Sequence, residues 1–240
     1  MPTPTLSNRR VAIFEDDQMN RERLSGLVKL CGGVAVPVDP PAPNLNRLKA
    51  YLANQRINLV ICDHHLSQRG DYAPYFGAQA IAESYRHGIG GILVTAYERD
   101  DAELSLRLYR RQIPALIRSP GDLDRANLQT ALLQAENEVQ KHQLTRERVP
   151  HRTIMTVQRV DVRGNFKIVK VMMSQWSSSQ EVGFPLDLIP VKLRSAAKSG
   201  SLLIAQVNIE AARSEDLFFD GFELPDTNVL QKAKAILGRP

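Results

Sequence analysis

Up to about residue 145, short apolar runs alternate with segments in which apolar residues recur every three or four positions. A short apolar run is typical of a buried strand, and the longer spacing is typical of a helix that covers a sheet. The alternation therefore predicts βα units around a parallel sheet. The predicted strands are 11–15, 34–38, 58–62, 91–95 and 114–118, and the predicted helices lie near 18–31, 44–55, 77–87, 99–111 and 122–146.

Beyond Pro150 the apolar residues alternate with polar ones, which is the period of a half-buried strand. Turn-forming residues such as Arg163-Gly164-Asn165 separate the runs. Five strands in succession predict a small all-β barrel. The predicted strands are 153–162, 166–173, 181–189, 202–209 and 217–224, followed by a terminal helix over 228–237.

The last helix of the α/β part is longer than a sheet-covering helix needs to be. Leu128, Leu132, Ala135 and Val139 form a short heptad seam along it. The seam fits a helix that packs on its own sheet. It also fits a helix whose distal half pairs with another chain in a homodimer or supports the second domain. The expected organisation is an α/β domain over 1–123, an extended linker helix over 124–150 and a small β-barrel output domain over 151–240.

Composition narrows the class of protein without choosing a function. No apolar run is long enough to span a bilayer, and the first residues lack the apolar stretch of a signal peptide, so a cytoplasmic location is predicted. Cys31 and Cys62 are expected to be ordinary thiols. The net charge of +5 permits contact with nucleic acid but does not favour it, because the basic residues form no dense cluster and no helix-turn-helix is visible.

Acidic and hydroxyl side chains stand where three predicted strands end. Glu15 ends the first strand and Asp16 follows it, Asp63 follows the third, and Thr95 ends the fourth. The carboxyl ends of parallel strands meet at one edge of a sheet, so these side chains should lie close together. Clustered carboxylates repel one another, and a hard cation such as Mg2+ relieves the repulsion. The pattern predicts a site for a divalent cation and a phosphoryl group, with one carboxylate as the nucleophile.

With this ordered spacing, residues 10–123 resemble the receiver domain of two-component response regulators. The resemblance implies a flavodoxin-like, doubly wound sheet of five parallel strands. It also implies that Asp63 accepts a phosphoryl group from a histidine kinase or phosphotransfer protein, and that Thr95 contacts this group and moves in the switch. The metal ligands that the resemblance implies for Mg2+ are Glu15, Asp16, Asp63 and the backbone carbonyl of His65.

Other positions match the family less evenly. Gly77 matches the glycine that opens the third helix, and Ser119-Pro120 matches a bond that is commonly cis. Ser119, however, stands where the family has the lysine that contacts the phosphoryl group. Arg118 is adjacent, but the alternation of side chains along a strand should direct it to the opposite face. The switch aromatic of the family falls on Leu116.

The connection after Asp63 is longer than in the family and is rich in Tyr, Pro and Gly over 68–76. Tyr97 follows Thr95 by two positions, where its ring fits either a shield for the phosphoryl group or a partly exposed loop residue. Trp176 lies in a polar loop of the barrel and fits either a contact with a partner or a lid over the barrel core.

Two binding functions remain open. In the first, the chain is an atypical response regulator that binds Mg2+, is phosphorylated on Asp63 and signals through protein–protein contacts of its barrel with an unknown partner, without catalysis on a small molecule. In the second, it is a pseudo-receiver scaffold that binds a partner whatever its phosphorylation state. Retention of all three carboxylates and Thr95 favours the first, because a scaffold has no physical need for mutually repelling acids.

A remote enzymatic alternative rests on Asp63-His64-His65, which resembles the namesake motif of the DHH phosphoesterases. These enzymes hold paired metal ions for phosphoester hydrolysis. Their companion motifs are missing, and His151 is the only histidine of residues 151–240. A zinc site on His64 and His65 lacks a third ligand at suitable spacing, which favours ordinary loop histidines.

Overall fold

The computed structural model describes residues 5–66, 72–96 and 103–226. The described residues fall into two compact units. The first unit holds residues up to 96 together with 112–145. The second holds 103–111 together with 146–226. Each unit is therefore built from two segments that are not contiguous in the sequence.

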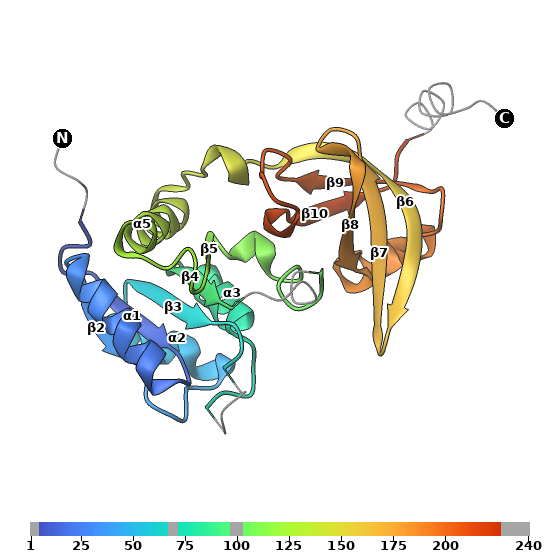
Figure 1. Cartoon of the computed structure of the whole chain (residues 1–240). Helices are drawn as coiled ribbons and strands as arrows, with labels where there is room; N and C mark the ends of the chain where they lie inside the picture. The colour runs from blue at the N-terminus through green and yellow to red at the C-terminus, as the bar shows by residue number, and fades with distance from the viewer. Residues whose placement is uncertain (1–4, 67–71, 97–102, 227–240) are drawn as a thin grey trace. The chain divides into compact units, whose positions relative to one another are not determined.

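The first unit contains a five-stranded parallel sheet whose strand order is β2-β1-β3-β4-β5 (Figure 1). This order is the one of flavodoxin-like doubly wound sheets, as predicted. Its strands are β1 Arg10–Phe14, β2 Val34–Pro37, β3 Leu59–Asp63, β4 Gly90–Thr95 and β5 Ala115–Arg118.

Helices cover both faces of this sheet. On one face, α1 and α5 share a hydrophobic core with alternate residues of the strands, among them Ile13, Ile61 and Ile117. On the other face α3 contacts β3 and β4, and α2 contacts α3. The helices are α1 Gln18–Leu30, α2 Leu45–Asn54, α3 Gly77–Arg86 and α5 Arg125–Lys141.

Three of the four residues of the heptad seam of α5 belong to the core of the first unit, whereas Val139 is only half-buried and lies outside that core cluster. Leu128, Leu132 and Ala135 are fully buried there, which confirms that the helix packs on its own sheet. The Asp124 side chain caps its N-terminus by accepting a hydrogen bond from the backbone N–H of Asn127. The helix ends at Lys141 rather than near residue 146.

The second unit contains an antiparallel sheet whose strand order is β10-β9-β6-β7-β8. Rings from its two edge strands pack against each other, with 4.6 Å between the ring centroids of Phe184 and Phe219, so the sheet curls around its own core. Trp176 packs on this core and donates to the carbonyl of Ala211 (2.9 Å), which favours the lid interpretation. The strands are β6 His151–Arg163, β7 Phe166–Met173, β8 Ser177–Pro185, β9 Leu202–Val207 and β10 Phe219–Glu223.

The segment 103–111 is part of the second unit, although it lies between β4 and β5 in the sequence. Both carboxylate oxygens of Glu103 accept hydrogen bonds from Lys170 Nζ, at 2.6 and 2.7 Å. Arg107 donates to the carbonyls of Ser214 and Leu217, and Arg110 forms an ion pair with Asp216.

The helix predicted over 99–111 does not extend beyond Glu103 in its described part. Residues 104–109 form turns, and Arg110–Gln112 form a short 3-10 helix. The side chains of Arg107 and Arg110 are buried within the second unit. Their tertiary contacts there override the local helical pattern.

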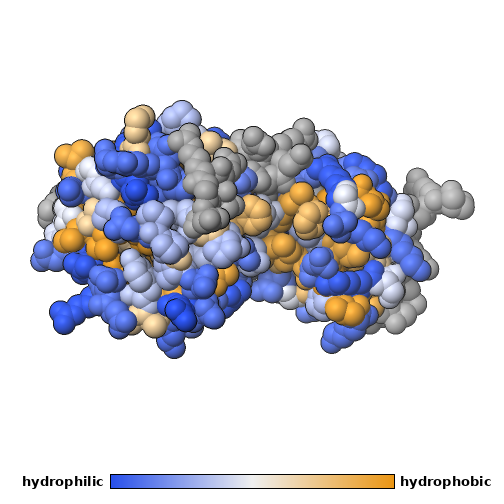
Figure 2. All heavy atoms as spheres, turned by 90° about the horizontal axis from the view of Figure 1, so that it is seen from below, coloured by the Kyte–Doolittle hydropathy of each residue, from blue (hydrophilic) through white to orange (hydrophobic). Residues whose placement is uncertain are grey.

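No helix of the described residues is both long enough and apolar enough to cross a membrane. Figure 2 shows hydrophilic residues over much of the visible face, with scattered orange patches. Scattered apolar side chains are normal for a protein surface. The helix predicted over 228–237, the tip of the connection after Asp63 and Tyr97 lie outside the described residues.

Candidate acidic site at the carboxyl edge of the sheet

Three carboxylates meet where β1 and β3 end. Phe14 and Cys62 are register partners on these neighbouring strands, so the residues that follow them reach the same edge of the sheet. One ligand atom from each of Glu15, Asp16 and Asp63 lies within 4.8 Å of the others. The strand ends therefore bring together the acidic side chains that the sequence singled out.

Glu15 is the most buried of the three, with 5% of its surface exposed. Burial, followed by repulsion from Asp63 and Asp16, raises the pKa of its carboxyl from 4.5 to about 8, against the opposing hydrogen bond from Asp17. That bond joins the backbone N–H of Asp17 to Glu15 Oε1 at 3.1 Å. A divalent cation would relieve both the burial and the repulsion.

Asp63 lies in a similar environment. Burial raises the pKa of its carboxyl, while hydrogen bonds from the backbone of His65 and His64 oppose the rise. The bond from the His65 N–H to Asp63 Oδ2 is 2.7 Å long. These backbone donors favour the ionised form, which is the form that can act as a nucleophile or metal ligand.

Thr95 ends β4 on the strand next to β3, where Val94 is the register partner of Asp63. Only 1% of the Thr95 surface is exposed, and its Oγ1 has no hydrogen-bond partner among the described residues. Buried hydroxyl groups in native proteins nearly always have a partner. This hydroxyl is therefore well placed to bond a ligand at the acidic edge.

Gly77 lets the N-terminus of α3 approach the end of β3. Its backbone N–H donates to the carbonyl of His64 (2.9 Å). A Cβ at this position would overlap the carbonyl oxygen of Asp63 and lie 2.9 Å from Cys62 Sγ. The close approach requires glycine, in agreement with the role that the sequence resemblance implied for Gly77.

No family model matches the chain, and no curated protein matches it. Its similarity is to solved structures of receiver domains. A response regulator receiver domain from Clostridium thermocellum is 14% identical, with a TM-score of 0.42, over 56% of this chain and 99% of that chain. The receiver domain of an HD domain-containing protein from Pseudomonas fluorescens is 18% identical, with a TM-score of 0.42, over 56% of this chain and 98% of that chain. The response regulator TrrA from Thermotoga maritima, solved with Mg2+ and BeF, is 18% identical, with a TM-score of 0.38, over 51% of this chain and 96% of that chain.

The first unit has a receiver fold. Its strand order and flanking helices are sufficient for this assignment. Within the receiver fold, the carboxylate oxygens at the edge suit Mg2+, which prefers hard oxygen ligands.

The two histidines after Asp63 do not join the metal-type cluster, which among the described residues contains carboxylates alone. His64 is fully buried, and its ring stacks on Phe76 with 5.2 Å between centroids. A packing role accounts for its burial. The backbone carbonyl of His65 as a metal ligand stays a prediction.

The end of β5 differs from the receiver pattern as the sequence indicated. The Ser119-Pro120 peptide is cis, as predicted, and the Ser119 N–H donates to the Thr95 carbonyl (2.9 Å). Burial alternates along β5, so Arg118 lies on the face opposite to the buried Ile117. Ser119 thus follows the strand beside Thr95 without bringing a cation to the site.

Sequence reasoning missed one residue that contacts the site. Tyr72, in the long connection after β3, accepts a hydrogen bond from the backbone N–H of Glu15 (3.3 Å) and donates one to the carbonyl of Val38 (2.8 Å). The extra length of this connection and its aromatic residues were the available signal. No local pattern linked that signal to Glu15.

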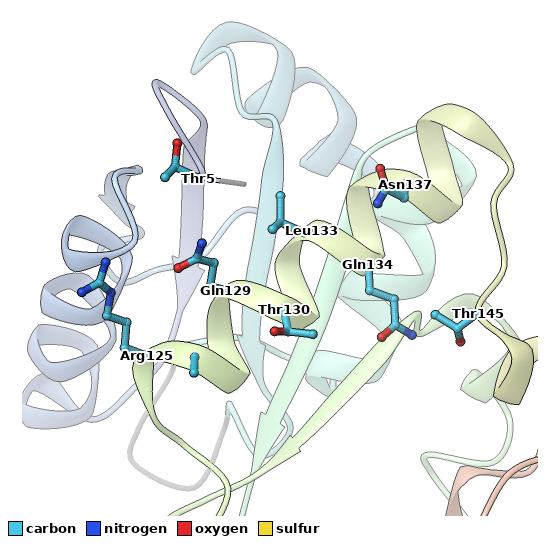
Figure 3. A pocket seen from close by; sticks show the side chains of 9 residues that line it. Thr5, Arg125, Gln129, Thr130, Leu133, Gln134, Asn137 and Thr145 are labelled. Carbon is cyan, nitrogen blue, oxygen red and sulfur yellow. The ribbon is translucent and has the colours of Figure 1, made fainter. Parts of the chain in front are cut away.

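A separate groove runs along α5 and has a volume of about 730 Å3 (Figure 3). It is lined by polar side chains such as Gln129, Gln134 and Asn137 from successive turns of the helix. It contains none of the acidic site residues, so this groove is distinct from the site.

Proposed function

We propose that the chain is an atypical response regulator in which Asp63 accepts a phosphoryl group from a phosphorylated histidine of a kinase or phosphotransfer protein. One observation carries this proposal. Three carboxylates lie within 4.8 Å of one another beside the fully buried hydroxyl of Thr95, which has no described partner. Such an arrangement is unfavourable without a cation and an oxyanion.

The bonds made and broken in the transfer balance between Asp63 and the donor. A carboxylate oxygen of Asp63 forms the new bond to phosphorus, and the phosphorus–nitrogen bond of the donor breaks. The departing imidazole nitrogen keeps the electron pair and takes up a proton. Thr95 Oγ1 donates a hydrogen bond to a phosphoryl oxygen, which gives the buried hydroxyl its partner.

Glu15, Asp16, Asp63 and the backbone carbonyl of His65 would hold Mg2+. When bound, this ion would neutralise the carboxylates and the charge on the phosphoryl oxygens. Ser119 offers only a neutral hydroxyl where the receiver family has a cation. We therefore expect the charge of the acyl phosphate to be balanced less completely than in a typical receiver domain.

The signal would leave the chain through protein–protein contacts of the second unit rather than through catalysis on a small molecule. The partner of this unit is unknown, and a homodimer through α5 is a further possible assembly. Nucleic acid is a less favoured partner, since the charge of the second unit is dispersed.

A second candidate function is a scaffold that binds its partner independently of phosphorylation. The observation that favours it is the combination of Ser119 and Leu116 at two positions that support switching in the receiver family. Such a protein would keep the receiver fold and use its surface alone.

One measurement distinguishes the two proposed functions. The purified chain is incubated with a small-molecule phosphodonor and Mg2+, and its intact mass is measured. We expect the mass of one added phosphoryl group, lost in Asp63→Asn and retained in Asp122→Asn, where the aspartate is exposed and outside the site. An unchanged mass, or an equal gain in Asp63→Asn, would sink the phosphoacceptor proposal and favour the scaffold.

A further inference from the structure

A chain of two hydrogen bonds links the acidic site to the connection between β3 and α3. The backbone N–H of Glu15 donates to Tyr72 Oη (3.3 Å), and Tyr72 Oη donates to the Val38 carbonyl (2.8 Å). A hydroxyl carries one proton and two lone pairs, so it can serve both groups at once. Because Tyr72 is 3% exposed, water cannot easily replace either bond.

Glu15 is held at its other polar atoms as well. Arg21 Nη1 donates to the Glu15 carbonyl (2.7 Å), and the Asp17 N–H donates to Glu15 Oε1 (3.1 Å). These bonds oppose the repulsion from the neighbouring Asp16 and Asp63, which would otherwise drive the residue away from the cluster. Tyr72 supplies the bond that holds the amide side of Glu15.

Tyr72 is itself fixed in place by the backbone around it. Its carbonyl accepts a hydrogen bond from the Ala42 N–H (2.8 Å). Nearby in the same connection, the hydroxyl of Tyr75 donates to the carbonyl of Pro43 (2.8 Å). The connection after β3 is thereby attached to the segment that follows β2, and the Tyr72 hydroxyl cannot move far from Glu15.

We infer that Tyr72 is a positioning residue of the cation site, whose hydroxyl holds the backbone of Glu15 so that the Glu15 carboxylate remains available to Mg2+. This inference rests on the proposed function, in which Glu15 is a metal ligand. Tyr72 touches neither the metal nor the phosphoryl group and acts through Glu15 alone.

The test compares Tyr72→Phe with Tyr75→Phe in the full chain. Each variant removes one buried tyrosine hydroxyl of the same connection, but only the Tyr72 hydroxyl contacts Glu15. Isothermal titration with MgCl2 should give about three- to ten-fold weaker binding for Tyr72→Phe and no change for Tyr75→Phe. In the metal-free protein, hydrogen exchange of the Glu15 amide should be faster in Tyr72→Phe alone.

The outcomes separate this inference from the proposed function. If the wild type binds Mg2+ and both variants bind it equally well, or are weakened equally, the positioning role is refuted and the proposed function stands. If the wild type itself shows no saturable Mg2+ binding, the metal site of the proposed function fails. Amide exchange at Glu15 then still decides the backbone role: unchanged exchange in Tyr72→Phe refutes that role as well.

Discussion

Two carboxylates on the same chain occupy opposite electrostatic environments. Glu15 is buried beside Asp16 and Asp63, and these neighbours add to the effect of burial in raising its pKa. Glu103 lies between two cations, with Lys170 Nζ at 2.6 Å and an Arg163 nitrogen at 3.4 Å. Buried ion pairs of opposite charge are typical of contacts within the fold, whereas clusters of like charge are typical of ligand-binding sites.

The two connections that follow β3 and β4 also differ in the unit to which they belong. The connection after β3 returns to its own unit, where Tyr72 contacts Glu15 and Gly77 touches the end of β3. The described part of the connection after β4, residues 103–111, is built into the second unit. The connection after β3 thus contributes contacts to the acidic site. The connection after β4 begins at Thr95 and leads to a segment that belongs to the second unit.

The largest expected effect tests the first connection. In Gly77→Ala the new Cβ would overlap the backbone carbonyl of Asp63, which cannot move without displacing the end of β3. We expect the free energy of unfolding of the receiver unit to fall by about 4 kcal/mol. The measurement is urea unfolding followed by far-ultraviolet circular dichroism.

Gly26→Ala is the matched control, because a Cβ at Gly26 within α1 meets no atom within 4 Å. That variant should be neutral or gain up to about 1 kcal/mol, since alanine favours helix over glycine. Equal effects of the two variants would mean that α3 does not approach Asp63 as closely as the structure has it.

The second prediction tests the other connection. Glu103→Gln leaves the ammonium of Lys170, which is 7% exposed as a residue, without its charged partner. We expect the free energy of unfolding of the second unit to fall by about 3 kcal/mol. Trp176 is the only tryptophan of the chain and lies in this unit, so its fluorescence during urea unfolding reports on the change.

Glu210→Gln serves as the control for this prediction. Glu210 pairs with Arg146, whose side chain is 84% exposed, and exposed pairs contribute less than about 1 kcal/mol. If Glu103→Gln cost no more than Glu210→Gln, the segment 103–111 would not be an integral part of the second unit.

The sequence was sufficient for the acidic site because its members are local features of strands. Glu15, Asp63 and Thr95 each mark the end of an apolar run, and the strand order then brings those ends together. Gly77 and the cis bond at Ser119-Pro120 were implied by the resemblance to receiver domains, and the structure agrees with both.

The features that sequence reasoning missed depend on partners far away along the chain. The apolar and basic residues of 99–111 fit a helix locally, yet Glu103 finds Lys170 across 67 positions and Arg107 finds Leu217 across 110. Tyr72 likewise reaches Glu15 across 57 positions. Periodicity carries no information on such pairs, so neither the course of this segment nor the role of Tyr72 could be predicted.

The third and smallest prediction concerns the charge of the site itself. The pKa of Glu15 is raised from 4.5 to about 8, so the folded chain holds this proton more tightly than the unfolded chain. The stability that the proton contributes is fully present below pH 4.5 and is lost as the pH rises through about 8. Relative to Glu15→Gln, we expect the metal-free wild type to lose about 2 kcal/mol between pH 6 and pH 8 in urea unfolding.

Glu22→Gln, at an exposed position of α1, should follow the pH dependence of the wild type. Saturating Mg2+ should remove most of the loss in the wild type and change Glu15→Gln little, because a bound cation stabilises the ionised carboxylate. In the metal-free chain at pH 8, the change from Glu to Gln should therefore stabilise the fold at position 15 and destabilise it at position 103. The same sign at both positions would mean that the acidic cluster is no more strained than an ordinary ion pair, and the electrostatic argument for a ligand at this edge would fail.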